Sequence, residues 1–384
     1  MNMNHFQEKL LCLKWKKNKL NNNTYLKINL KNLVANFLFL KSKISDTTKF
    51  LGVVKAFGYG SNSIEIAKCL EKHSIDYLAV AYTSEAIQLR ENGIKIPILV
   101  LHPQIGDFKS IFQYDLEPNI YSFKILNEFI NYKSINPNQA IHLKFNTGLN
   151  RLGFKYSDIN TLCDIIMSNN INIKYIFSHL GASEDLSEIQ FTESQIKLFE
   201  KISEDMEKKL NRRIDKHLLN TSGILNFSDY QYNMVRSGIG LYGFGNDYNY
   251  RRDLKPVVSL ISTISQIHEI KKGESVGYNR GFIAEKNTKV GIVPIGHADG
   301  ISRALGNRKG KLVVNDVRCD IIGNVCMDML MIDISSVDCN EGDEVIVFDE
   351  EKQTAEDFSK YSDTISYEIL TSISQRIRRT YLSD

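Results

Sequence analysis

The sequence predicts an α/β barrel followed by a mostly β domain, and two observations carry this prediction. Between residues 49 and 240, short apolar runs alternate eight times with helix-like segments, as they do in a (β/α)8 TIM barrel. After Pro256 the apolar runs continue, but glycine-rich turns replace the long helices until about residue 354. A chain of 384 residues is long enough for two or three such domains.

The barrel prediction depends on eight candidate strands. Most are apolar along their whole length, which suits strands that are buried on both faces of a parallel sheet. Helix-like segments separate them, for example 63–73, 84–92, 123–134 and 187–210. An open, doubly wound sheet is the alternative, but the GxGxxG fingerprint expected after its first strand is absent. The eight candidate strands are 49–57, 77–82, 97–102, 117–121, 140–146, 173–180, 215–222 and 234–240.

The second domain is expected to span residues 256–384 and to be rich in strands. Its candidate strands are 257–270, 289–295, 311–317, 325–334 and 343–348. A short alternating strand, 24–30, precedes the barrel region 24–255, and we expect it to join the β domain. Residues 1–23 are polar and rich in lysine and asparagine, which predicts a disordered tail.

Charge and cysteine content exclude several classes of protein. The formal net charge is +3, but residues 1–23 hold five lysines and one glutamate, so the remainder carries −1. A general nucleic-acid-binding surface needs a basic excess that this body lacks. The six cysteines form no CxxC pair and no zinc-finger spacing, so neither a disulfide scaffold nor a metal site is expected, and free thiols suit the cytoplasm. No signal peptide and no run of ~18 apolar residues is present, so no membrane association is expected.

Polar residues at the carboxyl ends of the candidate strands are the first site candidates, because barrel active sites lie at that face. These ends should converge on one mouth. The candidates are Lys55, Lys144, Arg151, His179, Asn220, Thr221, Arg236, Gly238 and Ile239.

Lys55 and the glycine-rich turn after the last strand together suggest a cofactor. A lysine that follows Val53 and Val54 is costly to bury unless its pKa falls, so it either snorkels to solvent or serves as a reactive Schiff-base amine. The turn at Gly238, with Thr221 on the neighbouring strand, is typical of phosphate sites after barrel strands 7 and 8. A reactive lysine beside a phosphate cradle indicates pyridoxal 5'-phosphate (PLP).

Arg236 indicates which reactions a PLP site of this kind would favour. Many PLP enzymes place a carboxylate on the pyridine nitrogen, whereas this mouth offers an arginine and no obvious acid. An arginine cannot accept the nitrogen's proton. Such a site favours simple proton exchange, although a structural ion pair is the alternative role for Arg236.

Taken together, these segments resemble alanine racemases over roughly residues 24–384. The resemblance implies an N-terminal PLP barrel with a C-terminal β domain, in agreement with the hydrophobic pattern. It implies a homodimer in which Tyr278 and Met327 reach the site of the partner subunit. The matching segments are VVKAFGYG (53–60), HLKFNTGLNRLGF (142–154), SHLGAS (178–183), MVRSGIGLYG (234–243), VGYNRG (276–281), PIGHADG (294–300), GNVCMDM (323–329) and ISYEILTSISQR (365–376).

The resemblance implies two catalytic bases, Lys55 and Tyr278. Racemisation removes the Cα proton from one face and returns it on the other, so each face needs one acid/base group. A tyrosine pKa near ~10 is too high for an efficient base at neutral pH. A nearby cation should lower it, and His179 or Arg236 is a candidate.

The resemblance also assigns the binding residues. Arg236 faces the pyridine nitrogen with support from His179, and Arg151 contacts the phenolic oxygen and the substrate carboxylate. Lys144 matches a lysine that is often carbamylated and positions Arg151. Met327 contacts the substrate carboxylate through its backbone N–H. The phosphate contacts are Tyr59, Thr221, Gly238 and Ile239, with Asn220 beside them.

Three positions depart from the family pattern. His297 replaces a tyrosine that lines the substrate entrance, and Gln375 replaces a phosphate-contacting tyrosine. A glutamine can still donate to phosphate, and this form of the segment resembles racemase modules fused to a peptidoglycan ligase. Asn146 replaces an aspartate, which is expected to weaken the surroundings of Lys144.

The leading hypothesis is therefore an alanine racemase that interconverts L- and D-alanine for peptidoglycan. A racemase of broader specificity, for example for serine, stays open because of His297. A related decarboxylase would need an acid in place of Arg236. A non-catalytic PLP-binding protein would lack the second domain and any equivalent of Tyr278.

Overall fold

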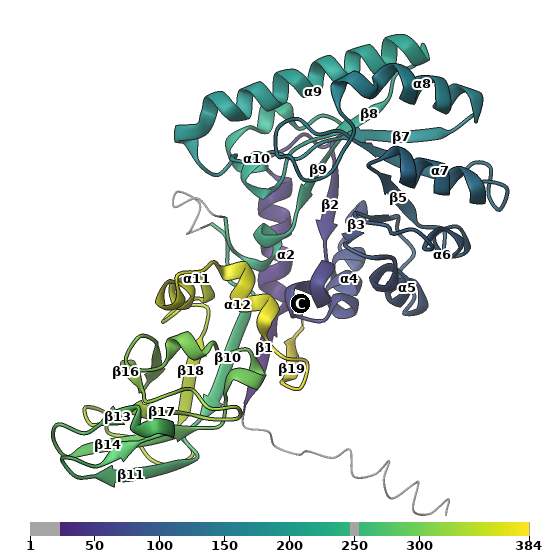
Figure 1. Cartoon of the computed structure of the whole chain (residues 1–384). Coiled ribbons are helices and arrows are strands. Elements are labelled where there is room, and N and C mark those ends of the chain that lie inside the picture. Colours follow the sequence, from purple (N-terminus) through teal and green to yellow (C-terminus); the bar gives the residue numbers. More distant parts are fainter. Residues whose placement is uncertain (1–23, 246–252, 384) are drawn as a thin grey trace, which may run out of the picture. The chain divides into compact units, whose positions relative to one another are not determined.

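The computed structural model describes residues 24–245 and 253–383, and it contains the predicted barrel. Eight parallel strands close on one another in chain order (Figure 1). Their first and last members pair directly, with Leu51 opposite Arg236. The barrel prediction is therefore confirmed. The strands are β2 (Lys49–Val53), β3 (Tyr77–Val80), β4 (Ile98–Val100), β5 (Glu117–Ile120), β6 (Ala140–Lys144), β7 (Asn172–Phe177), β8 (Asp215–His217) and β9 (Met234–Ser237).

Helices follow the strands and surround the barrel (Figure 1). Their N-termini are often capped by a short polar side chain, as where Ser122 accepts from the backbone N–H of Ile125. The helices are α2 (Leu30–Lys41), α4 (Ser63–Lys72), α5 (Thr83–Glu91), α6 (Phe108–Gln113), α7 (Phe123–Tyr132), α8 (Ile159–Ser168), α9 (Ile189–Leu210) and α10 (Thr221–Asn226). No helix in the described ranges is long and apolar enough to cross a bilayer.

The observed strands end earlier than the apolar runs that predicted them. At 49–57, β2 ends at Val53 and a short segment, α3 (Lys55–Tyr59), replaces the expected strand end. Hydrophobicity continues past the strand because this turn is itself packed, with Tyr59 buried. The residues left beyond the strand ends include most of the site candidates.

A second, nine-stranded sheet follows the barrel, in the order β11-β14-β17-β16-β15-β18-β10-β1-β19. The early strand β1 (Tyr25–Asn29) lies in this sheet, between β10 and β19. The other members are β10 (Val258–Thr263), β11 (Gln266–Ile270), β14 (Thr288–Val293), β15 (Lys311–Val314), β16 (Val317–Ile322), β17 (Leu330–Asp333), β18 (Glu344–Phe348) and β19 (Arg378–Leu382). The strands β12 (Ser275–Val276) and β13 (Phe282–Ile283) pair separately.

Turn chemistry explains where the predicted β strands were wrong. The run 257–270 is two strands. The predicted strand 311–317 crosses the turn of a hairpin formed by residues 311–322, whose two turn residues, Asn315 and Asp316, both have positive φ. Asparagine and aspartate tolerate that conformation in two-residue hairpin loops. Only 330–333 of the run 325–334 is a strand, and β19 was not expected at all.

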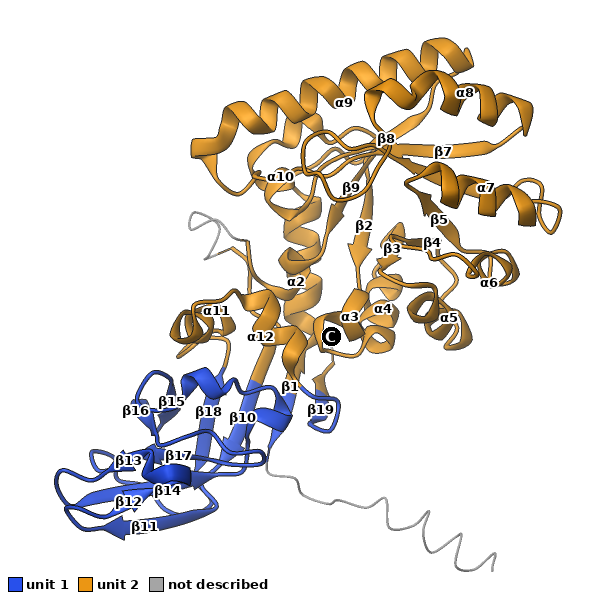
Figure 2. Cartoon of the chain, viewed as in Figure 1, with its two compact units in different colours: residues 1–26, 260–348, 374–380 blue, residues 27–259, 349–373, 381–384 orange. Residues whose placement is uncertain are grey.

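The chain forms two compact units (Figure 2). Unit 1 contains Leu260–Phe348 and Ser374–Thr380, and a small apolar core of Val276, Val290, Ile322 and Met331 lies within it. Unit 2 contains the barrel (Lys27–Ser259) and also Asp349–Ile373, with the helices α11 (Ala355–Ser359) and α12 (Ser366–Ser372). The sequence-based domain boundaries stay a prediction, and the predicted tail, 1–23, lies outside the described residues.

Candidate active site at the barrel mouth

A cavity of about 820 Å³ lies at the carboxyl ends of the barrel strands. It brings together ten of the residues predicted from the sequence, all of them in unit 2. One carboxylate, the exposed Glu184, also lines it, which the sequence did not indicate. The ten predicted residues are Lys55, Tyr59, Lys144, Arg151, His179, Asn220, Thr221, Arg236, Gly238 and Ile239.

Lys55 stands at the start of a left-handed turn. Ala56, Phe57 and Tyr59 all have φ between 51° and 54°, a conformation that costs an L-residue about 1–2 kcal/mol. Glu85 stabilises the turn, because its carboxylate accepts the backbone N–H of Ala56 at 2.7 Å. The turn begins immediately after the lysine, and strained backbone of this kind is typical of functional sites.

The Lys55 amine is only partly exposed, and its pKa is lowered. Burial is the main cause and the positive charge of Arg151 adds to it, while Glu85 opposes them. A lowered pKa increases the fraction of neutral, nucleophilic amine at a given pH. Lys55 therefore has the electrostatic surroundings of a reactive lysine.

Arg236 is held by four contacts on the floor of the cavity. One nitrogen, Nη2, donates to the carbonyls of Ser178 (2.9 Å) and Leu218 (3.0 Å) and lies 3.2 Å from Nδ1 of His179. The other, Nη1, lies 2.5 Å from Nδ1 of His217. Burial, with a smaller effect of Arg151, lowers the pKa of Arg236 to about 9, so the guanidinium is still charged at neutral pH.

His179 is not the cation that the sequence suggested. Burial and then the charge of Arg236 hold its pKa well below the usual value, so the ring is neutral near pH 7. It contacts Arg236 as expected, but only Arg236 of the two proposed cations carries a charge. The assignment of His179 as a possible source of positive charge for Tyr278 was therefore wrong.

Lys144 is buried among cations. Burial, followed by Arg236, Arg151 and Lys55, lowers its pKa to about 7. Asn146 does not act on this amine directly, because its side chain organises the loop instead. The Asn146 Oδ1 accepts the backbone N–H groups of Gly148 (3.1 Å) and Asn150 (3.0 Å). An asparagine therefore suffices to shape the loop that carries Arg151.

Small residues and hydroxyl groups form another part of the cavity lining, among them Tyr59, Thr221 and Gly238. A Cβ at Gly238 would collide with the hydroxyl of Tyr59, so only glycine fits there. Thr221 Oγ1 lies 2.9 Å from Ser237 Oγ. The Asn220 side chain caps α10, accepting the N–H of Gly223 at 2.8 Å. Tyr367 of α12, which the sequence did not single out, also lines the cavity.

Four predicted residues lie in unit 1. Tyr278 and Met327 line a second, mostly apolar cavity of about 520 Å³, and their side chains are 72% and 58% exposed. Tyr278 stands in a tight turn that follows Gly277 (φ 75°). His297 and Gln375 are exposed and do not line that cavity.

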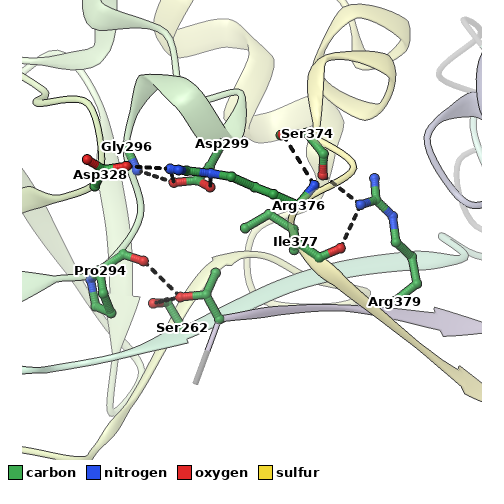
Figure 3. Close-up of polar contacts among 10 residues, drawn as sticks. Ser262, Pro294, Gly296, Asp299, Asp328, Ser374, Arg376, Ile377 and Arg379 are labelled. Carbon is green, nitrogen blue, oxygen red and sulfur yellow. Dashed lines mark hydrogen bonds and ion pairs between the residues drawn. The ribbon is translucent and has the colours of Figure 1, made fainter. Parts of the chain in front are cut away.

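An arginine connects the segments that carry these residues (Figure 3). Arg376, which follows Gln375, donates to both carboxylate oxygens of Asp299 at 2.6 and 3.0 Å and to Asp328 at 2.8 Å. Asp299 lies two residues after His297, and Asp328 follows Met327. The ion pairs therefore tie together three segments that the sequence had marked separately.

The sequence also missed a line of buried polar side chains behind Arg236. His217 of β8, His142 of β6 and Glu117 of β5 are buried inside the barrel. The available signal was a lone histidine between apolar residues, as at His142 between Ile141 and Leu143. Within the described ranges, no group of three or more histidine, cysteine or acidic side chains is placed to hold a metal ion.

The fold and the cavity define a barrel enzyme whose mouth gathers lysines and arginines for an anionic cofactor or substrate. Residues 28–245 match the family model for the alanine racemase N-terminal domain, and 257–381 match the model for its C-terminal domain. The chain therefore belongs to the alanine racemase family.

The similarity to individual relatives covers nearly the whole chain. The alanine racemase of Thermodesulfovibrio yellowstonii is 34% identical over 366 residues, which cover 93% of this chain and 97% of the relative. The structure of alanine racemase from Clostridium difficile 630 has a TM-score of 0.87 at 32% identity and covers 95% of this chain and 97% of its own. The structure of the Bartonella henselae alanine racemase with covalently bound pyridoxal phosphate has a TM-score of 0.86 at 27% identity, covering 94% and 99%.

Proposed function

We propose that this chain is a PLP-dependent alanine racemase that interconverts L-alanine and D-alanine and supplies D-alanine for peptidoglycan. The observation that carries the proposal is the likeness to alanine racemases across both domains. The placement of Lys55 and Arg236 in one barrel cavity agrees with it.

The residues of the cavity fit the proposed cofactor. Four cationic side chains suit a phosphate and a substrate carboxylate, and the bare backbone at Gly238 leaves room for an oxygen-rich group against Tyr59. The first N–H groups of α10 and of the short 3₁₀ helix that begins at Ile239 lack acceptors within their own helices. The Bartonella henselae relative holds pyridoxal phosphate covalently, which supports the same cofactor here.

Each predicted residue receives a role in this proposal. Lys55 would hold PLP covalently, and Arg236, steadied by His179, would contact the ring nitrogen. Arg151, aided by Lys144, and the Met327 N–H bind the substrate carboxylate, and His297 lines the entrance. The phosphate would be held by Tyr59, Asn220, Thr221, Gly238 and Ile239, which line the barrel cavity, and the phosphate contact of Gln375, which does not line it, stays a prediction.

Two side chains move the proton. When bound, PLP withdraws electrons from the Cα of the amino acid and makes its proton acidic. Lys55 exchanges that proton on one face and Tyr278 on the other, so the configuration inverts. Because Arg236 is a cation at neutral pH and only donates, it leaves the ring nitrogen unprotonated. This favours proton exchange over other reactions of the bound amino acid.

A homodimer completes each site in this proposal. Tyr278 and Met327 are large side chains in an apolar cavity of unit 1, yet both are largely exposed. Exposed apolar surface of this kind is typical of protein interfaces. Each barrel cavity would then receive Tyr278 of the partner subunit. The five cysteines in the described part of the chain form no disulfide, which supports a cytoplasmic location.

A racemisation assay tests the function. The purified holoenzyme is given L-alanine or L-serine, and the appearance of each D-enantiomer is followed. We expect alanine to be the preferred substrate, Lys55→Ala to abolish turnover, and borohydride to fix the cofactor on Lys55. Lys68→Ala on the exposed face of α4 is the matched lysine control and should keep full activity. No interconversion of alanine by the cofactor-loaded protein would refute the proposal.

A further inference from the structure

A continuous line of polar side chains runs through the barrel interior from Arg236 toward the opposite end. His217 Nε2 lies 3.0 Å from His142 Nδ1, and His142 Nε2 lies 2.7 Å from Glu117 Oε2. Lys174 Nζ closes the line with a 2.6 Å contact to Glu117 Oε1. Glu117 is the first residue of β5 and therefore lies at the amino end of the barrel, away from the cavity.

These side chains are buried, so each of their polar atoms needs a hydrogen-bond partner within the protein. Both histidines are 0% exposed, Arg236 is 5% exposed and Glu117 is 8% exposed. A buried polar group that lacks a partner costs about 1–3 kcal/mol, so each ring nitrogen must match its neighbour. Burial is the main cause that lowers the pKa of both histidines, and Arg236 adds to it. Glu117 opposes the shift at His142 without reversing it, so both rings are neutral.

The two ends of the line fix the direction of every hydrogen bond. Arginine only donates, and an ionised carboxylate only accepts. Burial alone would raise the pKa of Glu117, but His142 and Lys174 outweigh it and lower the pKa, so the carboxylate is ionised. His142 must then donate from Nε2 to Glu117, which leaves Nδ1 as an acceptor. His217 in turn donates from its own Nε2, and its Nδ1 accepts from Arg236.

The reverse arrangement is excluded at the cavity end. If both rings carried their proton on Nδ1, an N–H of His217 would face an N–H of Arg236 at 2.5 Å between nitrogens. The ionised carboxylate of Glu117 therefore influences Arg236 through the tautomers of His142 and His217. None of the intermediate residues lines the cavity.

We propose that Glu117 and His142 are positioning residues that lock His217 in its Nε2–H form and so give Arg236 the acceptor that holds it in place. The tautomer claim stands on the contacts alone. Its consequence for racemisation rests on the proposed function of Arg236 at the ring nitrogen.

Glu117→Gln is the decisive perturbation because Lys174 controls how the new amide turns. Lys174 only donates, so it takes the amide oxygen and leaves the NH2 facing His142. His142 must then accept at Nε2 and donate from Nδ1, which forces the proton of His217 onto Nδ1, opposite Arg236. The double variant Glu117→Gln/Lys174→Met removes that constraint. The amide can turn its oxygen toward His142, and the original tautomers return.

Ring ¹⁵N NMR of the full-length holoenzyme, labelled at histidine, measures the tautomers directly. We expect Nε2–H on His142 and His217 in the wild type, Nδ1–H or a mixture in Glu117→Gln, and Nε2–H again in the double variant. Glu207→Gln, which weakens the ion pair with Lys216, the neighbour of His217 in β8, controls for the loss of an ion pair close to this line of side chains. It should leave both rings unchanged.

Racemisation provides the second readout. We expect kcat to fall roughly 10- to 100-fold in Glu117→Gln, the size of one lost hydrogen bond to a charged group, with little change in KM and with recovery in the double variant. Nδ1–H rings in the wild type, or unchanged rings in Glu117→Gln, would overturn the proposal. If the rings show the predicted tautomers but the protein does not racemise alanine, the proposed function is wrong, and the tautomer proposal still holds.

Discussion

Carbamylation of Lys144 is open to a quantitative test. Carbon dioxide reacts only with a neutral amine, and an ordinary lysine with a pKa of 10.5 is neutral in about one molecule in 3,000 at pH 7. Lys144 has a pKa of about 7, so about half of it is neutral at that pH. The buried site therefore offers on the order of 1,000 times more reactive amine than an exposed lysine does. The cations that lower the pKa, Arg236 and Arg151, would also stabilise the carbamate's negative charge.

The pH dependence of stability follows from the same shift. In the unmodified protein the folded pKa of Lys144 lies below the unfolded value of 10.5. The unfolded chain binds more protons between about pH 7 and 10.5, so the stability of the unmodified protein rises with pH across that window. The full cost of burying the charge, at most roughly 5 kcal/mol, is present below pH 7. Lys144→Met should therefore be more stable than the unmodified wild type at pH 6, with a smaller difference at pH 9.

The assay is ¹³C NMR after addition of ¹³C-bicarbonate at pH 8. We expect one carbamate carbon per chain, lost on acidification below pH 7 and absent in Lys144→Arg, which keeps a positive charge but offers no comparable amine. The exposed Lys68 should give no signal. A wild-type spectrum without a carbamate, or a signal that persists in Lys144→Arg, would show that the burial argument fails.

Three further predictions concern packing, the ion pairs of unit 1 and subunit sharing. Gly153→Ala would place a Cβ 2.6 Å from backbone atoms of the preceding loop and should lower the free energy of unfolding by about 3 kcal/mol. Gly93→Ala, also at positive φ but in open space, is the control and should lower it by about 1 kcal/mol. Denaturant titrations measure both values. Arg376→Gln leaves the buried Asp299 without its ion pair and should lower both the free energy of unfolding and the turnover; unchanged values of both would argue against a positioning role for Arg376. Equal mixing of inactive Lys55→Ala and Tyr278→Phe subunits should restore up to about a quarter of wild-type activity, because half of the dimers would contain one intact site. Mixed dimers without activity would contradict the proposal that each active site contains Tyr278 of the partner subunit.

The sequence predicted the barrel because strands buried on both faces are apolar almost without interruption, as at Leu78–Val80. It predicted the cavity because the carboxyl ends of parallel strands meet at one mouth. It located Tyr278 only through the family resemblance, since nothing in its local pattern separates it from other tyrosines.

The features that the sequence did not indicate depend on contacts between distant strands, on backbone strain or on burial. The left-handed turn at Ala56 and Phe57 is encoded in residues that usually avoid that conformation, so propensity gave no sign of it. The contact between His142 and His217 joins strands β6 and β8, which are not neighbours in the barrel. Burial decides the neutral state of His179, and no residue type alone reveals it.

Deuterium exchange in the Tyr278→Phe holoenzyme tests the two-base claim most directly. L-alanine and D-alanine are incubated separately in D2O, and both the interconversion and the deuterium at Cα are measured. We expect interconversion to fall at least about 100-fold, while one enantiomer alone still exchanges its Cα hydrogen through Lys55. Interconversion at the wild-type rate, or equal exchange of both enantiomers, would contradict the two-base mechanism.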